Sequence, residues 1–153
     1  MARPKIGDIV EIDTGQGLAY AHYTHQHPMY GALLRVFANR KPTRPADLSA
    51  VVNGEPTFSA FFPLSAALHR NLVSIAGHVP LSERAKKFPV FRAGVVDPKT
   101  GKVADWWLWD GVTERRVGPL TDEMRTFPIR GTWNDTILIE RILSGWTPEN
   151  DPT

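Results

Sequence analysis

Three histidines near the start of the chain, His22, His25 and His27, form its one cluster of metal-ligating residue types. In a β-strand, side chains two positions apart point to the same face, so His25 and His27 would lie together. A zinc site would then need a third ligand from another segment. Pro28 follows at once, and no Asp or Glu lies between residues 14 and 46. We therefore expect no metal site, and interpret this segment as a solvated loop or as a surface that faces a partner.

Catalytic chemistry has little support in the sequence. There is no cysteine, and no serine lies in the Gly-x-Ser-x-Gly pattern of a nucleophile. Gly15 and Gly17 form a turn pair, without the longer glycine pattern or the lysine that holds a phosphate. The carboxylates of Asp105 and Asp110 are typical of solvated strand ends. We therefore predict that the protein is not an enzyme and takes no cofactor.

Residues 105–111 read DWWLWDG, with three tryptophans between two aspartates. In a strand, Trp107 and Trp109 would share one face, opposite to Trp106 and Leu108. Two arrangements are open. Either the C-terminal helix covers Trp107 and Trp109, or one pair is partly exposed and anchors a partner, as tryptophan does at many protein interfaces. In the second arrangement, the flanking aspartates would meet a basic surface of that partner.

Positive and aromatic side chains gather in the acid-free region between residues 14 and 46. They are four cations and four rings: Arg35, Arg40, Lys41, Arg44, Tyr20, Tyr23, Tyr30 and Phe37. Aromatic residues among positive charges are typical of a nucleic-acid groove. An acidic protein partner would use the same charges, and a solvated loop has the same composition, so these three interpretations stay open.

The composition is typical of a soluble globular protein. The length of 153 residues fits one domain, which we predict to span residues 1–153. Apolar residues make up 42% of the chain, and no run approaches the roughly 18 apolar residues of a membrane span. The opening MARPKIGDIV lacks the apolar core of a signal peptide, and the absence of cysteine agrees with a cytoplasmic setting. The formal net charge of +2 does not by itself indicate nucleic-acid binding.

Thirteen prolines and twelve glycines divide the chain into short segments, which favours strands. Apolar alternation and turn residues predict strands over residues 8–13, 18–24, 32–37, 57–62, 73–76, 91–96, 103–109 and 113–117. A short strand is also our interpretation of residues 50–53. Residues 64–72 fit either a helix or an extended segment.

Two helices have start signals. Ser82 predicts the cap of a short helix over residues 82–87, and Asn134 or Asp135 predicts the cap of a longer one over residues 136–144, which ends at Gly145. Together these elements predict an α+β protein. We expect a twisted antiparallel β-sheet or a small SH3-like barrel with a C-terminal α-helix, and leave the strand order open.

Several motifs resemble a known family. They are the opening KIGDIVEI from Lys5, the glycine turn followed by Tyr20, the segment VSIAGHVPL over residues 73–81, and NDTILIERILSG over residues 134–145. In this order and spacing, across most of the chain, they resemble the immunity protein 26 family of bacterial polymorphic toxin systems.

The resemblance implies a non-enzymatic protein that binds and neutralises a cognate protein toxin. The alternative is a small β-barrel that binds nucleic acid through the region 14–46. The oligomeric state stays open. We predict these partner-binding residues: Trp107, Trp109, Asp105, Asp110, Tyr20, His25, His27 and Arg40.

Overall fold

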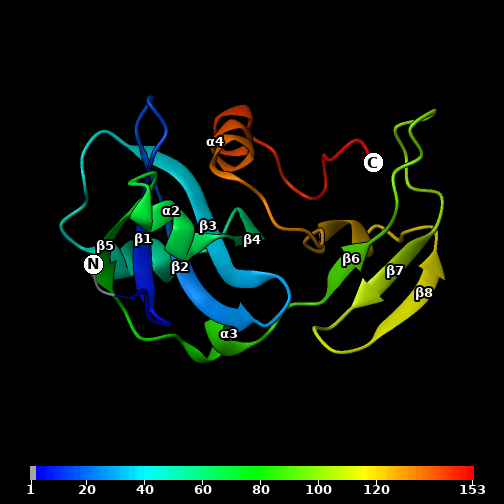
Figure 1. Ribbon diagram of the computed structural model, residues 1–153, viewed down its shortest axis with the longest axis horizontal. Helices are drawn as coiled ribbons and strands as arrows, with labels where there is room; N and C mark the ends of the chain where they lie inside the picture. The colour runs from blue at the N-terminus through cyan, green and yellow to red at the C-terminus, as the bar shows by residue number, and fades with distance from the viewer. Residues whose placement is uncertain (1–2) are drawn as a thin grey trace. The chain divides into compact units, whose positions relative to one another are not determined.

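The computed structural model describes residues 3–153, and backbone contacts divide the chain into two compact units (Figure 1). Unit 1 runs to Lys87 and resumes over Gly131–Gly145, while unit 2 comprises Phe88–Arg130 and Trp146–Thr153. The single domain stays a prediction, because this division describes the folded chain and not how it unfolds.

Unit 1 is built on a five-stranded antiparallel sheet. Its strands are β1 (Asp8–Asp13), β2 (Leu18–His27), β3 (Gly31–Lys41), β4 (Phe58–Phe62) and β5 (Ser74–His78). They lie in the order β4-β3-β2-β1-β5. The turn between β1 and β2 contains Gly15 and Gly17, both with positive φ, a conformation that glycine adopts without steric strain. β2 and β3 both extend beyond their predicted ends, because His27 pairs with Gly31 and Lys41 pairs with Leu18.

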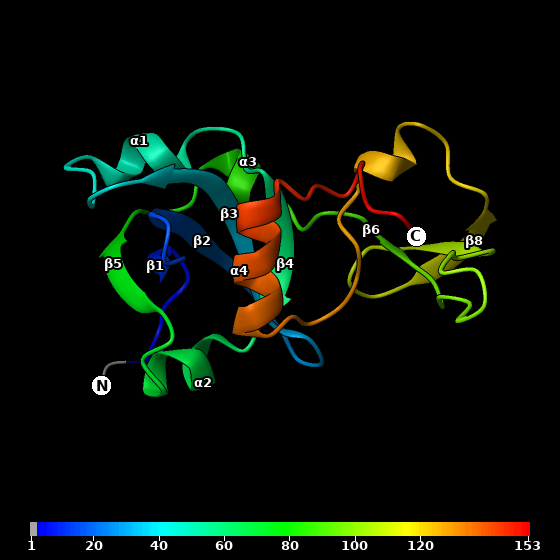
Figure 2. The same ribbon diagram turned by 90° about the horizontal axis from the view of Figure 1, so that it is seen from above.

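Four helices accompany this sheet (Figure 2): α1 (Leu48–Val52), α2 (Leu64–His69), α3 (Glu83–Lys86) and α4 (Asp135–Ser144). The predicted strand at residues 50–53 is wrong. The Asp47 side chain accepts hydrogen bonds from the backbone N–H groups of Ser49 and Ala50, and so caps α1. The segment left open at residues 64–72 begins as helix α2.

Side chains from separate elements cover the sheet of unit 1. Tyr20 and Phe37 pack against Val52 of α1. The ring of Phe58, on β4, lies 5.3 Å from that of Trp133, which comes just before α4. Figure 2 shows α4 running beside β3 and β4. The central parts of β1, β2, β3 and β4 therefore carry mostly buried side chains, while the edge strand β5 has no buried residue.

Asn134 is the observed cap of the C-terminal helix. Its side chain accepts a hydrogen bond from the backbone N–H of Ile137 at 2.8 Å, and Gly145 ends α4 in the left-handed region. We expect Asn134→Ala to lower the free energy of unfolding by about 1 kcal/mol, because the first turn loses its acceptor. Urea denaturation measures this change. Asn134→Ser retains an acceptor and is the control; equal losses in both variants would contradict a capping role.

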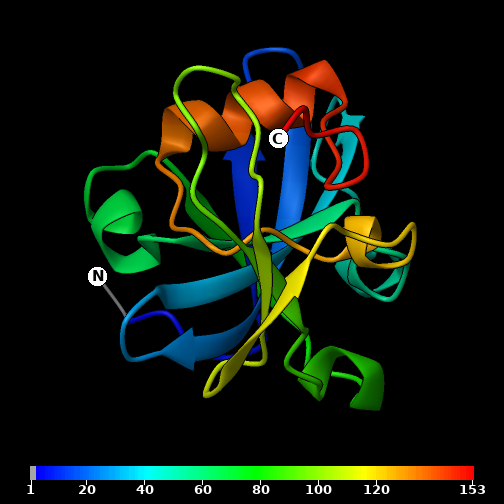
Figure 3. The ribbon, with the colours of Figure 1, turned by 90° about the vertical axis from the view of Figure 1, so that its right-hand side faces the viewer.

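Unit 2 contains a three-stranded antiparallel sheet in the order β6-β7-β8, seen in Figure 3. Its elements are β6 (Phe91–Ala93), β7 (Trp106–Trp109), β8 (Glu114–Gly118) and the 3₁₀ helix η1 (Met124–Thr126). The strands of the predicted hairpin are shorter than expected, since only one bridge, Val96 with Val103, continues the pairing toward the loop. Chain segments far apart in the sequence meet in this unit, because residues 146–153 belong to it.

The predicted α+β class is confirmed. The five-stranded sheet does not close into a barrel, since β4 and β5 are its two edges and do not pair with each other, so the SH3-like barrel is not the observed arrangement. Within residues 3–153, none of the helices combines the length and the apolar composition needed to span a membrane.

Candidate functional site

β7 exposes one of its three tryptophans. Trp107 is 37% exposed, while Trp106, Leu108 and Trp109 are buried. The ring of Trp109 lies 5.4 Å from that of Phe91, so aromatic side chains of unit 2 cover it. Trp107 and Trp109, which the sequence predicts on one face of the strand, therefore have different environments.

Trp107 lines a hollow of about 360 Å³ in unit 2. Val95, which is 87% exposed, also lines it, so apolar side chains contribute to the hollow. Its lining residues come from β6, β7, β8, the hairpin loop and the segment after η1: Ala93, Gly94, Val95, Asp97, Ala104, Asp105, Trp107, Glu114 and Arg130. The hollow is large enough to admit side chains of a partner beside an aromatic ring.

Two ion pairs stand at the rim of this hollow. Asp105 accepts a hydrogen bond from Nε of Arg116 at 2.8 Å, and Glu114 accepts one from Nη1 of Arg130 at 2.9 Å. The hydrogen bond to Asp105 raises the pKa of the Arg116 guanidinium. Exposed pairs of this kind add little stability.

Asp110 has a local structural role. Its carboxylate accepts hydrogen bonds from the backbone N–H groups of Thr113 and Val112, at 2.8 and 3.0 Å. These bonds, that of Thr113 above all, lower the pKa of Asp110. Asp110 thus holds the turn between β7 and β8, while Asp105 lies beside Trp107.

Tyr20 is fully buried in unit 1, so its side chain is not offered to a partner. Its hydroxyl donates a hydrogen bond to Glu11 at 2.9 Å, and Glu11 in turn pairs with Arg44 at 2.7 Å. Burial, followed by this bond, raises the pKa of Tyr20 to about 12. The side chain of Tyr20 therefore belongs to the core and to a polar chain at its margin.

His25 and His27 make separate local contacts. Nε2 of His25 lies 2.8 Å from the backbone oxygen of Lys86, which ties β2 to α3. Nδ1 of His27 accepts hydrogen bonds from the backbone N–H groups of Met29 and Tyr30 in the turn after β2. In the part of the chain that the structure describes, no group of three or more His, Cys, Asp or Glu residues is arranged to hold a metal ion.

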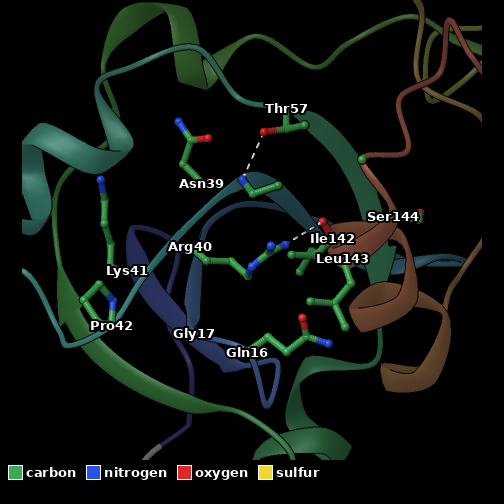
Figure 4. A pocket seen from close by; sticks show the side chains of 12 residues that line it. Gln16, Gly17, Asn39, Arg40, Lys41, Pro42, Thr57, Ile142, Leu143 and Ser144 are labelled. Atoms are coloured by element: carbon green, nitrogen blue, oxygen red, sulfur yellow. Dashed lines mark hydrogen bonds between the residues drawn. The ribbon is translucent and has the colours of Figure 1, made fainter.

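Arg40 lies at a second hollow, of about 850 Å³, in unit 1 (Figure 4). Its guanidinium points toward the end of α4, where Nη1 donates to the backbone oxygen of Ile142 at 3.4 Å. Lys41 and Asn39 also line this hollow, and no acidic residue does. Of the predicted residues in unit 1, Arg40 is the one beside a large open space.

The aromatic residues of region 14–46 mostly face inward. Tyr20, Tyr23 and Phe37 are buried, so their rings are not presented to nucleic-acid bases. Tyr30 packs on Phe61 with the ring centroids 5.3 Å apart. Alternation in the sequence does not reveal this, because both faces of the sheet are covered.

His22 is the most buried histidine of the three, although its place in the sequence indicates no separate role for it. It is 2% exposed, and its Nε2 lies 3.1 Å from the backbone oxygen of Gly7 and 2.8 Å from that of Val79. Both neighbours of Nε2 are carbonyl oxygens, which only accept hydrogen bonds. Nε2 therefore carries the proton and donates it to them. Nδ1 is buried and has no hydrogen-bond partner within residues 3–153.

This burial predicts a pH-dependent stability. Burial lowers the pKa of His22 below its usual value of 6.5, so the unfolded chain takes up this proton first as the pH falls. We expect the contribution of His22 to be fully present above about pH 6.5. Below it, stability falls by up to about 1.4 kcal/mol per pH unit until the folded state is also protonated. Urea denaturation across this range measures the slope. His22→Gln, which does not titrate, should flatten it, and an unchanged slope would contradict the assignment.

Comparisons with protein-family models, with curated proteins and with solved structures found no match for this chain.

Proposed function

We propose that this protein is a non-enzymatic immunity protein, which binds a bacterial protein toxin and blocks its action. The observation that carries the proposal is the exposed ring of Trp107 in a hollow rimmed by ion pairs. Tryptophan is among the commonest anchors of protein interfaces, and such anchors are typically surrounded by a polar rim. The resemblance to the immunity protein 26 family supports the same function, since an immunity protein acts by binding.

The charge around Trp107 favours a basic partner. The lining includes three carboxylates, of Asp97, Asp105 and Glu114, and one guanidinium, of Arg130, so it carries a formal charge of 1 − 3 = −2. Arg116 offsets one more of these charges through its pair with Asp105. Complementary charge speeds encounter and selects partners. A basic surface is typical of proteins that act on nucleic acid, so we propose a toxin of that class.

The proposed mechanism is occlusion. Trp107 would insert its ring against an apolar site of the toxin, while Asp105 and Glu114 would exchange part of their pairing with arginines for contacts to basic toxin residues. No bond is made or broken. The protein would protect the cell that makes the toxin, or a neighbour, and would act in the bacterial cytoplasm.

Co-purification tests this proposal. The tagged protein is expressed together with the product of each adjacent gene, and the complex is isolated by affinity chromatography followed by size exclusion. We expect one of these products to be retained in a stable stoichiometric complex. If none is retained under any salt condition at which both proteins are folded, the immunity function is wrong.

The nucleic-acid alternative has less support, because the rings of Tyr20, Tyr23 and Phe37 lie in the core. It predicts binding to DNA or RNA with a log affinity that falls steeply as log salt rises. Fluorescence anisotropy with a labelled oligonucleotide measures this slope, and the immunity proposal predicts no binding at physiological salt.

A further inference from the structure

Strand β3 has a partner on one side only over its last residues. β4 pairs with residues 32–36 of β3, and its register ends at the pair Val36 and Phe58. Beyond it, the Thr57 side chain accepts a hydrogen bond from the backbone N–H of Ala38 at 3.0 Å. Within residues 3–153, the backbone of Arg40 makes no hydrogen bond outside the pairing of β2 with β3.

The backbone groups of Val36 and Ala38 face away from β2. Along an antiparallel strand, the N–H and C=O of successive residues alternate between the two sides. The backbone oxygen of Val36 accepts from Thr57, and the N–H of Ala38 donates to it, so both face the β4 side. Beyond Ala38 the pairing with β2 is irregular, since Tyr20 lies opposite Phe37 and Leu18 lies opposite Lys41, and β4 no longer extends on the other side. We call residues 38–41 of β3 the open edge.

Two hollows flank the open edge. The hollow of about 850 Å³ shown in Figure 4 lies between this edge and the end of α4, and another of about 580 Å³ lies between it and α1. Both are lined by Ala38, Asn39, Lys41 and Thr57. A strand added at this edge would point its side chains alternately to the two faces of the sheet. The two hollows therefore offer space for the side chains on both faces of an added strand.

The charged side chains at the open edge favour some added strands over others. Arg40 donates only to the backbone oxygen of Ile142, and Lys41 makes no side-chain ion pair with any of the described residues. Asp47 and Glu55 line the smaller hollow, while the residues that line the larger one include Arg40 and Lys41 and no carboxylate, so the larger hollow is the one that suits an acidic side chain. Positive side chains on an exposed edge oppose pairing with another copy of the same edge, and they favour a strand that brings a carboxylate.

We propose that the open edge is a docking site for an extended, acidic segment of a protein partner. The segment adds as a strand beside residues 38–41, with main-chain hydrogen bonds to backbone groups of this edge that face away from β2, and a carboxylate in the larger hollow against the Arg40 guanidinium. Its alternate side chains enter the smaller hollow. This inference does not depend on the immunity function, because it concerns unit 1 and any protein that carries such a segment.

The test uses the full-length protein labelled with ¹⁵N and the peptide Thr-Val-Thr-Glu-Thr-Val-Thr with both ends blocked. We expect amide chemical shifts to change at residues 38–41 and at the facing end of α4 as the peptide is added. The same peptide with lysine in place of glutamate should bind at least about tenfold more weakly, since a charge-assisted hydrogen bond is lost and a repulsion added.

Two controls separate charge from strand addition. Arg40→Glu should weaken binding of the glutamate peptide by at least about tenfold, while Arg70→Glu, the same change at an exposed arginine after α2, should leave it within about twofold. A glutamate peptide with N-methylated alternate residues should not bind, because it lacks the main-chain donors.

Three results would overturn the inference: no shifts at residues 38–41, equal binding of the glutamate and lysine peptides, or binding of oligothymidine at this edge in place of the peptide. Each is read without a toxin. Failure here is thus distinct from failure of the co-purification experiment, which tests the immunity function alone.

Discussion

Arg92→Ala is expected to lower the free energy of unfolding by about 3 kcal/mol or more. Arg92 lies on β6 and is fully buried. Its guanidinium donates from Nη1 to the backbone oxygen of Arg125 at 2.7 Å and from Nη2 to that of Pro148 at 2.9 Å. It also lies 4.9 Å from the centre of the Trp106 ring. One side chain thus joins three separate segments of unit 2.

The cost of this substitution has two sources. The alanine variant leaves a cavity, and it leaves the buried carbonyl oxygen of Pro148 and the partly buried one of Arg125 without this donor. A buried acceptor left without a partner costs about 1–3 kcal/mol. Urea denaturation followed by tryptophan fluorescence is well suited to the measurement. Four of the five tryptophans, Trp106, Trp107, Trp109 and Trp146, lie in unit 2, so the emission reports mainly on this unit.

Arg92→Met separates the two sources. Methionine fills much of the space but donates no hydrogen bond, so we expect an intermediate loss, and Arg92→Lys should lose least because one carbonyl keeps a donor. If the alanine variant were as stable as the original protein, Arg92 would not hold residues 146–153 in unit 2 as described.

Trp107→Ala is expected to weaken binding of the cognate toxin by at least about thirtyfold, the effect of removing an interface anchor worth about 2 kcal/mol. The physical reason is the loss of a large rigid surface at the centre of the hollow. Because Trp107 is 37% exposed, its removal should leave the fold largely intact. Isothermal titration with the purified toxin measures the affinity, and circular dichroism checks the fold.

Val112→Ala is the matched control for this substitution. Val112 is 88% exposed in the turn after β7 and is also apolar, but it does not line the hollow around Trp107. We expect its affinity to stay within about twofold of the original value. Equal losses in the two variants would show that Trp107 is not the anchor, and a loss of fold in Trp107→Ala would show that it is a core residue.

Local sequence signals predicted much of the fold. Alternating residues and glycine turns located β1 and its hairpin with β2, and a capping residue with a terminal glycine located α4, because both depend on neighbours in the sequence. The helix α1 was missed. Four of its five residues are β-branched or small, and the stabilising contact is the cap by Asp47, which the apolar pattern of so short a segment does not reveal.

The surroundings of the candidate residues could not be predicted to the same extent. Alternation places Trp107 and Trp109 on one face, but it does not say that Phe88 and Phe91 cover one ring and leave the other exposed. Nor does it show that Arg92 is buried, since its donors meet carbonyl oxygens more than thirty positions away in sequence. Such contacts depend on tertiary packing, which pairs residues that are distant along the chain.

The same limit applies to the region between residues 14 and 46. Its composition is equally compatible with a groove and with a covered sheet, and only the burial of Tyr20, Tyr23 and Phe37 distinguishes them. Arg40 and Lys41 stand apart because they follow the last residue of β3 that pairs with β4. Whether a strand continues beyond the end of its neighbour depends on the whole sheet, so the sequence of one strand does not predict it.

Growth protection tests the central claim most directly. Bacteria carrying the adjacent toxin gene under an inducible promoter are plated with and without this protein, with the Trp107→Ala variant, and with the Val112→Ala control. The account predicts that the original protein and the Val112→Ala variant restore colony numbers, and that Trp107→Ala does so far less at matched expression. Death of the cells despite abundant folded protein, with every adjacent gene product tested, would contradict it.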